Sequence, residues 1–147
     1  MVDTSLDKKI SKATVRLKTS DNVYIGTGIL YFQDNFIDKI YVLTASHCLF
    51  EDGDKFQNLR NDIVIDILKS DFSGYEAIKV KTNDKLLFTS EKKDVALLVL
   101  EKKDVEKISG TVPLMSCVKE RGNSNNFITK GFPKATFGEE IAVFYPT

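Results

Sequence analysis

The chain has 147 residues and a mass of 16.6 kDa, which suits one domain, and 42% of its residues are hydrophobic, which excludes a disordered chain. Lysine and arginine number 21, as do aspartate and glutamate, so the formal net charge is zero. A neutral chain gives no electrostatic reason to expect nucleic acid or an anionic membrane as a partner.

Short apolar runs separated by turn residues fill the first hundred positions, a pattern typical of an all-β sandwich or barrel. After residue 44 the alternation stops, which predicts one helical turn over 45–50, followed by a polar loop over 51–60. Residues 70–74 predict a hairpin turn and 91–93 a charged, solvated turn. Six strands are predicted, at residues 13–19, 23–32, 39–44, 63–69, 75–82 and 95–100.

These six strands predict a six-stranded antiparallel β-barrel over residues 13–100. The second strand contains Gly26 and Gly28, and glycine inside a strand marks a bulge, a bend or a close backbone approach. The expected core includes the apolar residues Val15, Leu17, Ile29, Val42, Ile65, Val80, Leu97 and Val99.

The remaining third of the chain shows weaker structural signals. Residues 101–126 combine charged clusters with Gly110, Pro113, Gly122 and an Asn-Ser-Asn-Asn tract, which predicts a connector on the surface. Residues 127–132 and 139–145 predict two more strands that form a hairpin. We expect residues 127–147 to be the start of a second, incomplete β-unit.

The numbers of histidines and cysteines exclude several kinds of site. His47 is the one histidine, so no site that needs two imidazoles is available. Cys48 and Cys117 are the two cysteines, too few for a disulfide-built scaffold and hard to complete as a zinc site. We expect neither a metal nor a cofactor.

His47 and Asp94 stand out by their flanking residues. His47 lies in the segment Thr-Ala-Ser-His-Cys (44–48), where a strand ends, and Asp94 opens the apolar segment Asp-Val-Ala-Leu-Leu-Val-Leu (94–100). A serine hydroxyl is a weak nucleophile until a neighbouring imidazole removes its proton, and a carboxylate fixes the tautomer of that imidazole. Taken singly, His47 would be a polar surface residue and Asp94 an ordinary start of a strand. Together, with Gly-Thr-Gly (26–28) one strand upstream, they favour a catalytic pair.

This combination resembles the trypsin-like serine peptidases, which have the double-barrel chymotrypsin fold. The family signature Thr-Ala-Ala-His-Cys corresponds to residues 44–48, Asp-Ile-Ala-Leu-Leu-x-Leu to 94–100, and the small-residue strand to 26–30. The resemblance covers residues 13–145 and implies that residues 13–100 are the first barrel. It also implies that His47 is the general base and Asp94 the carboxylate that orients it, in an enzyme that hydrolyses peptide bonds through an acyl-enzyme without a metal or cofactor.

The family's nucleophile lies in the motif Gly-Asp-Ser-Gly-Gly of the second barrel, and this motif does not occur in the 147 residues. Ser73, in Asp-Phe-Ser-Gly (71–74), is a partial match, but we expect it in a hairpin turn of the first barrel and reject it. The chain therefore corresponds to an N-terminal half plus one hairpin. It is expected to hydrolyse no peptide by itself.

The sequence differs from the secreted members of this family in two further respects. Secreted members pair the cysteine after the histidine with one near the glycine-rich strand, where this chain has Gly26 and Thr27. We expect Cys48 to be a buried free thiol, as in a reducing compartment, and a bridge to Cys117 is the alternative. The activating start Ile-Val-Gly-Gly of the zymogens is also missing, so the resemblance is to bacterial and intracellular members.

The sequence predicts a cytoplasmic location. No segment approaches the roughly eighteen consecutive apolar residues of a membrane span, and the first ten residues lack the apolar region of a signal peptide. Neither a membrane nor nucleic acid is expected as a partner. The expected partners are a protein or peptide substrate and, through residues 127–147, a second copy or a complementary chain.

Three hypotheses for the function follow. The first is the N-terminal catalytic lobe of a trypsin-like serine endopeptidase, either truncated or completed by a separate chain that supplies the serine. The second is a catalytically inactive protease-fold module that binds a protein partner. The third, an unrelated small β-barrel binding domain, requires both motifs to be accidental.

Overall fold

The computed structural model describes residues 4–31, 38–111, 126–131 and 141–146, and half of them lie in antiparallel strands. The strands are β1 (Thr14–Lys18), β2 (Tyr24–Tyr31), β3 (Lys39–Thr44), β4 (Asp62–Leu68), β5 (Tyr75–Lys81), β6 (Leu86–Ser90), β7 (Val95–Glu101), β8 (Asn126–Gly131) and β9 (Ile141–Pro146). The helices are α1 (Thr4–Ala13), α2 (Thr82–Lys85) and α3 (Lys102–Ser109), with 3-10 turns η1 (Ser46–Leu49) and η2 (Gly53–Lys55).

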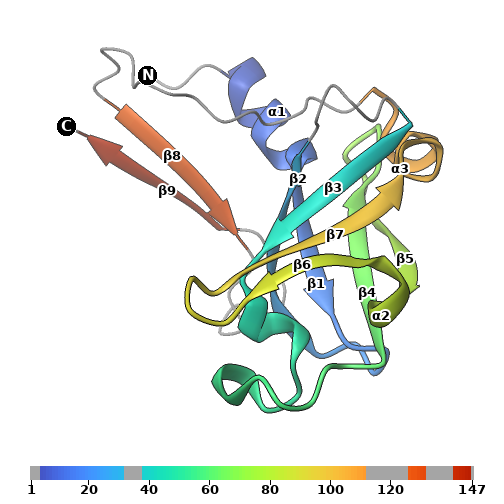
Figure 1. Ribbon diagram of the computed structural model, residues 1–147. Helices are drawn as coiled ribbons and strands as arrows, with labels where there is room; N and C mark the ends of the chain where they lie inside the picture. The colour runs from blue at the N-terminus through green and yellow to red at the C-terminus, as the bar shows by residue number, and fades with distance from the viewer. Residues whose placement is uncertain (1–3, 32–37, 112–125, 132–140, 147) are drawn as a thin grey trace.

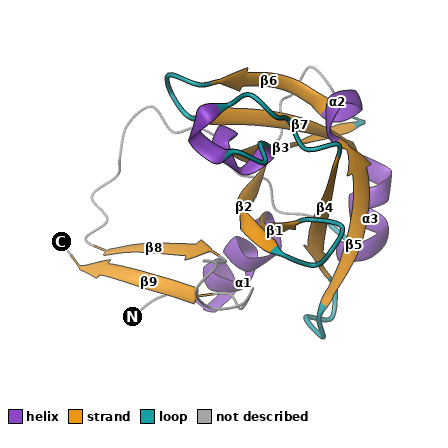
Figure 2. Cartoon of the chain, turned by 90° about the horizontal axis from the view of Figure 1, so that it is seen from below, coloured by secondary structure: helices purple, strands orange, loops and turns teal. Residues whose placement is uncertain are grey.

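Seven strands form one curled sheet in the order β5-β4-β1-β2-β3-β7-β6 (Figures 1 and 2). The edge strands β5 and β6 are joined by α2 alone, which has four residues and contacts both β5 and β7. Such a short link draws the two edges together at one end, so the sheet curls into a half-barrel. Within the part of the chain that the structure describes, no strand pairing joins β5 to β6.

All six strands predicted in the first hundred residues are present, with ends displaced by at most one residue. The predicted number of strands was too low, because β6 is a seventh member of the sheet. This strand is short and lies at an edge, and its apolar side chains Leu87 and Phe88 are exposed. The segment therefore lacks the buried alternation by which strands are recognised in a sequence.

Three helices, α1, α2 and α3, occur where the sequence pattern predicts none. α3 lies in the predicted surface connector 101–126, yet it packs on β3, β4 and β7, and its Val105 is fully buried in the main core. The helix is otherwise so polar that only Val105 and Ile108 mark its packed face. α1 precedes β1 and ends at Ala13. Among the described residues, no helix is long and apolar enough to cross a membrane.

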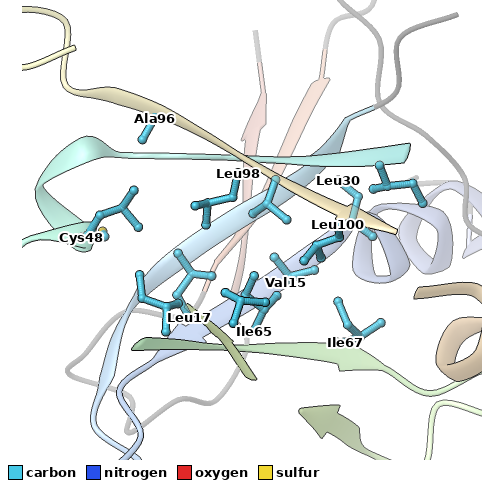
Figure 3. Packing of buried hydrophobic residues seen from close by; sticks show 14 of the residues in the cluster. Val15, Leu17, Leu30, Cys48, Ile65, Ile67, Ala96, Leu98 and Leu100 are labelled. Carbon is cyan, nitrogen blue, oxygen red and sulfur yellow. The ribbon is translucent and has the colours of Figure 1, made fainter. Parts of the chain in front are cut away.

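One face of the curled sheet carries the hydrophobic core (Figure 3). Its fully buried side chains come from β1 to β4, β7 and α3, with Leu49 of η1. Five of the predicted core residues are buried as expected, namely Val15, Leu17, Val42, Ile65 and Val80.

The prediction of a buried core position is wrong for three residues. Ile29 is 38% exposed, and Leu97 and Val99 are only half-buried, because they lie on the opposite face of the sheet. The buried residues of β7 are instead Ala96, Leu98 and Leu100. A run that is apolar at every position has no periodicity from which its inward face can be chosen, and a shift of one residue exchanges the two faces.

The last two strands, β8 and β9, pair with each other as an antiparallel hairpin, as predicted from 127–132 and 139–145. β8 contacts β1 and β2, so the hairpin lies beside the seven-stranded sheet (Figure 1). The positions between the two strands, 132–140, and most of the predicted connector, 112–125, lie outside the described residues.

Gly28 leaves no room for a side chain between its neighbouring strands. A Cβ atom at this position would lie 2.6 Å from Val42 Cγ1 and 2.9 Å from Val15 Cγ2. We expect Gly28→Ala to lower the free energy of unfolding by about 1–3 kcal/mol, because it overpacks a closed core. Urea denaturation measures this loss. In a Val42→Ala background the added methyl should cost less, and equal costs in both backgrounds would contradict the steric explanation.

Candidate active site

His47 and Asp94 lie side by side where β3 ends and β7 begins. Thr44, the last residue of β3, pairs with Ala96 of β7, so the residues just beyond these two strand ends are neighbours. His47 Nδ1 lies 2.6 Å from Asp94 Oδ2, and the backbone N–H of His47 donates to Asp94 Oδ1 at 2.8 Å. Both distances are those of hydrogen bonds. The predicted contact between these two side chains is confirmed.

The two contacts determine the orientation of both side chains. Each carboxylate oxygen of Asp94 has its own partner, so the carboxylate cannot rotate without losing both. An ionised carboxylate only accepts hydrogen bonds, so the neutral ring carries its proton on Nδ1 and leaves Nε2 as a proton acceptor. The His47 side chain is 50% exposed, which leaves the ring accessible to a reacting group.

A tight turn positions Asp94. Residues 91–94 join β6 to β7, and Asp94 has a φ of +52°, in the left-handed region that aspartate tolerates better than most residues. Its N–H donates to the Glu91 carbonyl at 3.3 Å, and the Lys93 N–H donates to Ser90 Oγ at 3.2 Å. The turn is the charged, solvated one that the sequence predicts, and it directs the carboxylate toward η1.

Buried neighbours anchor the turn that carries His47. η1 is the helical turn predicted over 45–50, and Ser46, Cys48 and Leu49 are buried around the exposed histidine. Arg60 Nε donates to the Cys48 carbonyl at 3.1 Å. At the preceding strand end, Thr44 Oγ1 donates to the Thr27 carbonyl at 2.8 Å, which ties β3 to the glycine-containing part of β2.

The hydrogen bonds from His47 lower the pKa of Asp94. The ring contributes most and the backbone N–H next. We expect an NMR titration of the Asp94 carboxyl carbon to give a midpoint below the ordinary value of 3.8, and His47→Phe to raise that midpoint. Because the folded-state pKa lies below the unfolded one, the stabilisation is present above the unfolded value and is lost as pH falls through the folded one.

Asp71 provides the control for this titration. Hydrogen bonds from Ser73 also lower the pKa of Asp71, but they involve neither His47 nor η1. Its midpoint should be the same in the wild type and in His47→Phe. An Asp94 midpoint that does not respond to His47→Phe would show that the ring does not contact the carboxylate in solution.

Cys48 is a free, buried thiol, as predicted, and burial raises its pKa. Position 26 faces the thiol, since a Cβ there would lie 2.5 Å from Cys48 Sγ. Gly26 therefore leaves the space that the sulfur occupies. Cys117, the alternative partner in a disulfide, is outside the described residues.

Ser73 is not brought to the histidine. It lies in the turn that joins β4 to β5, as predicted, where its N–H donates to Asp71 Oδ1 at 3.0 Å. Figures 1 and 2 both show that this turn and η1 lie at opposite ends of the molecule. The structure supports the rejection of Ser73 as a nucleophile for this pair.

Two polar residues beside the pair have almost no sequence signal. Ser46 is fully buried, and its hydroxyl hydrogen-bonds to the Thr89 hydroxyl of β6. The one sequence signal for Ser46 is that it stands where the trypsin-like signature, which residues 44–48 resemble, has its second alanine. Thr89 has none, because its strand is not apparent from the sequence.

No protein-family model matches the chain, and no curated protein matches it. Within residues 8–31 and 38–111, no group of three or more His, Cys, Asp and Glu side chains is arranged to hold a metal ion.

Proposed function

We propose that this chain is the lobe of a trypsin-like serine endopeptidase that carries the general base, His47, and its orienting carboxylate, Asp94. The observation that carries the proposal is the pair of hydrogen bonds between His47 and Asp94 at the end of a curled antiparallel sheet. In this proposal the sheet is the first β-barrel of a double-barrel enzyme, and β8 and β9 are the opening hairpin of the second.

The chemistry follows from the tautomer that Asp94 selects. His47 Nε2 takes the proton of a serine hydroxyl as its oxygen attacks the peptide carbonyl carbon, and then gives this proton to the leaving amine. Asp94 stabilises the imidazolium that exists between the two transfers. The same two proton transfers, with water as the nucleophile, hydrolyse the acyl-enzyme. The reaction uses no metal and no cofactor.

We place the nucleophilic serine outside these 147 residues, because the sequence contains no Gly-Asp-Ser-Gly-Gly motif. A further segment of the protein or a separate chain would supply this serine and the backbone donors of an oxyanion hole. Such a second lobe has to pack against the first close to His47.

An apolar row on the outer face of the sheet supports such packing. Strand register aligns Ile29, Leu43, Leu97 and Phe88 across β2, β3, β7 and β6. Ile29, Leu43 and Phe88 are exposed, and a continuous exposed apolar surface marks an interaction site. β8 contacts β1 and β2, and β2 carries one end of this row. We propose that the row receives the second lobe, of which residues 127–147 form the beginning.

Labelling with a fluorophosphonate, which reacts with activated serines, tests the proposal. We expect the 147-residue protein to be unlabelled and to hydrolyse no peptide, because nucleophile and oxyanion hole are missing. The product of the reading frame extended through a downstream Gly-Asp-Ser-Gly motif should be labelled at that serine. Labelling of the 147 residues at Ser73, absent in a Ser73→Ala control, would contradict the assignment.

A catalytically inactive protease-fold module that binds a protein partner is the second candidate, and the same apolar row favours it. This candidate predicts that an extended reading frame contains no such motif and that its product is not labelled. It also predicts that His47→Ala leaves partner binding unchanged. Labelling of the extended protein would exclude it.

A further inference from the structure

The η1 turn is attached to the β6–β7 hairpin at two points, of which the His47–Asp94 contact is one. The other is the hydrogen bond between Ser46 Oγ and Thr89 Oγ1. Ser46 directly precedes His47, and Thr89 lies on the strand that leads into the turn with Asp94. The two attachments therefore join the same two segments, which are η1 and the β6–β7 hairpin.

The sheet is built so that the second attachment can form. Thr44, Ala96 and Thr89 are paired in one row across β3, β7 and β6. The middle residue, Ala96, is fully buried and is the smallest side chain in an otherwise bulky strand. The row places Thr89 two strands away from Thr44, which lies two residues before Ser46. The Ser46 side chain is itself fully buried and Thr89 is exposed, so the bond between them is partly buried.

The hairpin that carries Asp94 needs such an anchor. β6 is an edge strand with β7 as its paired neighbour in the sheet, and the turn over 91–93 is exposed. An exposed edge hairpin opens more easily than the central strands. A displacement of the turn by about 1 Å would break both hydrogen bonds of Asp94, since these contacts have little tolerance in distance.

We propose that Ser46 and Thr89 are positioning residues, whose hydrogen bond holds the β6–β7 hairpin against η1 and so maintains the contact between His47 and Asp94. The inference deepens the proposed function, since it names what orders the proposed catalytic pair. It concerns a contact within the 147 residues, so it is testable without peptidase activity.

The test compares Thr89→Val, which removes the hydroxyl at nearly constant volume, with Thr89→Ser, which keeps the hydroxyl. His47 is the sole histidine, so nitrogen-15 labelling of imidazole gives a single pair of ring signals that report the tautomer. At a pH at which the ring is neutral, we expect Thr89→Val and Ser46→Ala to lower the ratio of the Nδ1–H to the Nε2–H tautomer by roughly threefold or more. Thr89→Ser should keep the wild-type ratio.

The second measurement is hydrogen exchange at backbone amides. The His47 amide, which donates to Asp94 Oδ1, should exchange its hydrogen about tenfold faster in Thr89→Val than in the wild type. The amide of Ile65, in β4, which is paired with a strand on both sides, should exchange at the wild-type rate, which separates local opening from global unfolding. Since Thr89 is exposed, its variants decide the question if Ser46→Ala does not fold.

Two results would overturn the inference. One is a wild-type tautomer ratio and His47 exchange rate in both Thr89→Val and Ser46→Ala. The other is a Thr89→Ser variant that behaves like Thr89→Val, since the hydroxyl would then be irrelevant. If the tautomer shifts as expected but an extended protein is not labelled by a fluorophosphonate, the inference stands and the proposed peptidase function fails.

Discussion

Asp94→Asn, made in the protein that also carries the nucleophile, is expected to lower kcat by about 10⁴-fold without loss of the fold. The reason lies in the two hydrogen bonds of the carboxylate. The backbone N–H of His47 requires an acceptor at the position of Oδ1, so the amide oxygen of asparagine takes that place. The amide NH₂ then lies at the position of Oδ2, next to His47 Nδ1.

An NH₂ group beside Nδ1 forces this nitrogen to accept a hydrogen bond, and the ring proton moves to Nε2. A ring protonated at Nε2 cannot take the proton of a serine hydroxyl, so catalysis is lost although the geometry is preserved. The inversion of tautomer is measurable by nitrogen-15 NMR in the 147-residue protein itself. Steady-state kinetics on the extended protein gives the loss in kcat.

Asp71→Asn is the matched control, because Asp71 is an exposed aspartate in a turn remote from η1. It should leave kcat within about twofold of the wild type, as surface substitutions away from a site do. A kcat within tenfold of the wild type in Asp94→Asn would show that His47 and Asp94 are not the catalytic pair. An Nδ1–H tautomer retained in Asp94→Asn would contradict the hydrogen-bond argument separately.

Asp66→Ala is expected to cause the largest loss of stability, about 3 kcal/mol or more of the free energy of unfolding. Asp66 is 2% exposed on β4, directly opposite Arg16 of β1. Arg16 Nε donates to Asp66 Oδ2 at 2.6 Å, and Lys18 Nζ lies 3.2 Å from the same oxygen. The two cations are only 16% and 15% exposed, so removal of the carboxylate leaves two poorly solvated positive charges.

Arg16 cannot easily move out to solvent in this variant. Its guanidinium lies over the rings of Tyr24 and Tyr75, 5.0 and 4.3 Å from their centroids. Cation–π contacts from β2, which pairs with β1, and from β5, which pairs with β4, therefore keep the charge in place. The cost of the unpaired charges then appears in the free energy of unfolding rather than being relieved by rearrangement.

Urea denaturation of Asp66→Ala measures the loss, with Glu76→Ala on the exposed side of β5 as a control that should change stability by less than about 0.5 kcal/mol. The triple variant Arg16→Met, Lys18→Met, Asp66→Leu should be far more stable than Asp66→Ala, because it removes all three charges together. A loss below about 1 kcal/mol in Asp66→Ala would show that the ion cluster is not needed to hold β1 against β4.

Features that depend on neighbouring residues were predictable. β3 was predicted with its observed bounds, Lys39–Thr44, because bulky and β-branched residues stand between clear turn residues. The β4–β5 turn and the η1 turn were also predictable, because each is indicated by the few residues that form it. His47 and Asp94 were recognisable as candidates because each has a distinctive flank.

Packing between distant segments was not predictable in the same way. The sequence of α3 is mainly polar, and that of β6 has no alternation of apolar and polar residues. Val105 is a core residue because α3 packs on β3, β4 and β7. The sequence predicts Leu97 and Val99 as core residues, but Ala96, Leu98 and Leu100 face the core. The inward face of an apolar run depends on the strand with which the run pairs.

The sequence alone thus determined six of the seven strands of the sheet and the residue types of the candidate pair, because local propensity and turn chemistry act over a few positions. The tertiary structure decided the rest. Pairing of Thr44 with Ala96 brings His47 to Asp94, and the same row places Thr89 within reach of Ser46. These contacts join segments more than forty residues apart, and only the register of β3, β7 and β6 specifies them.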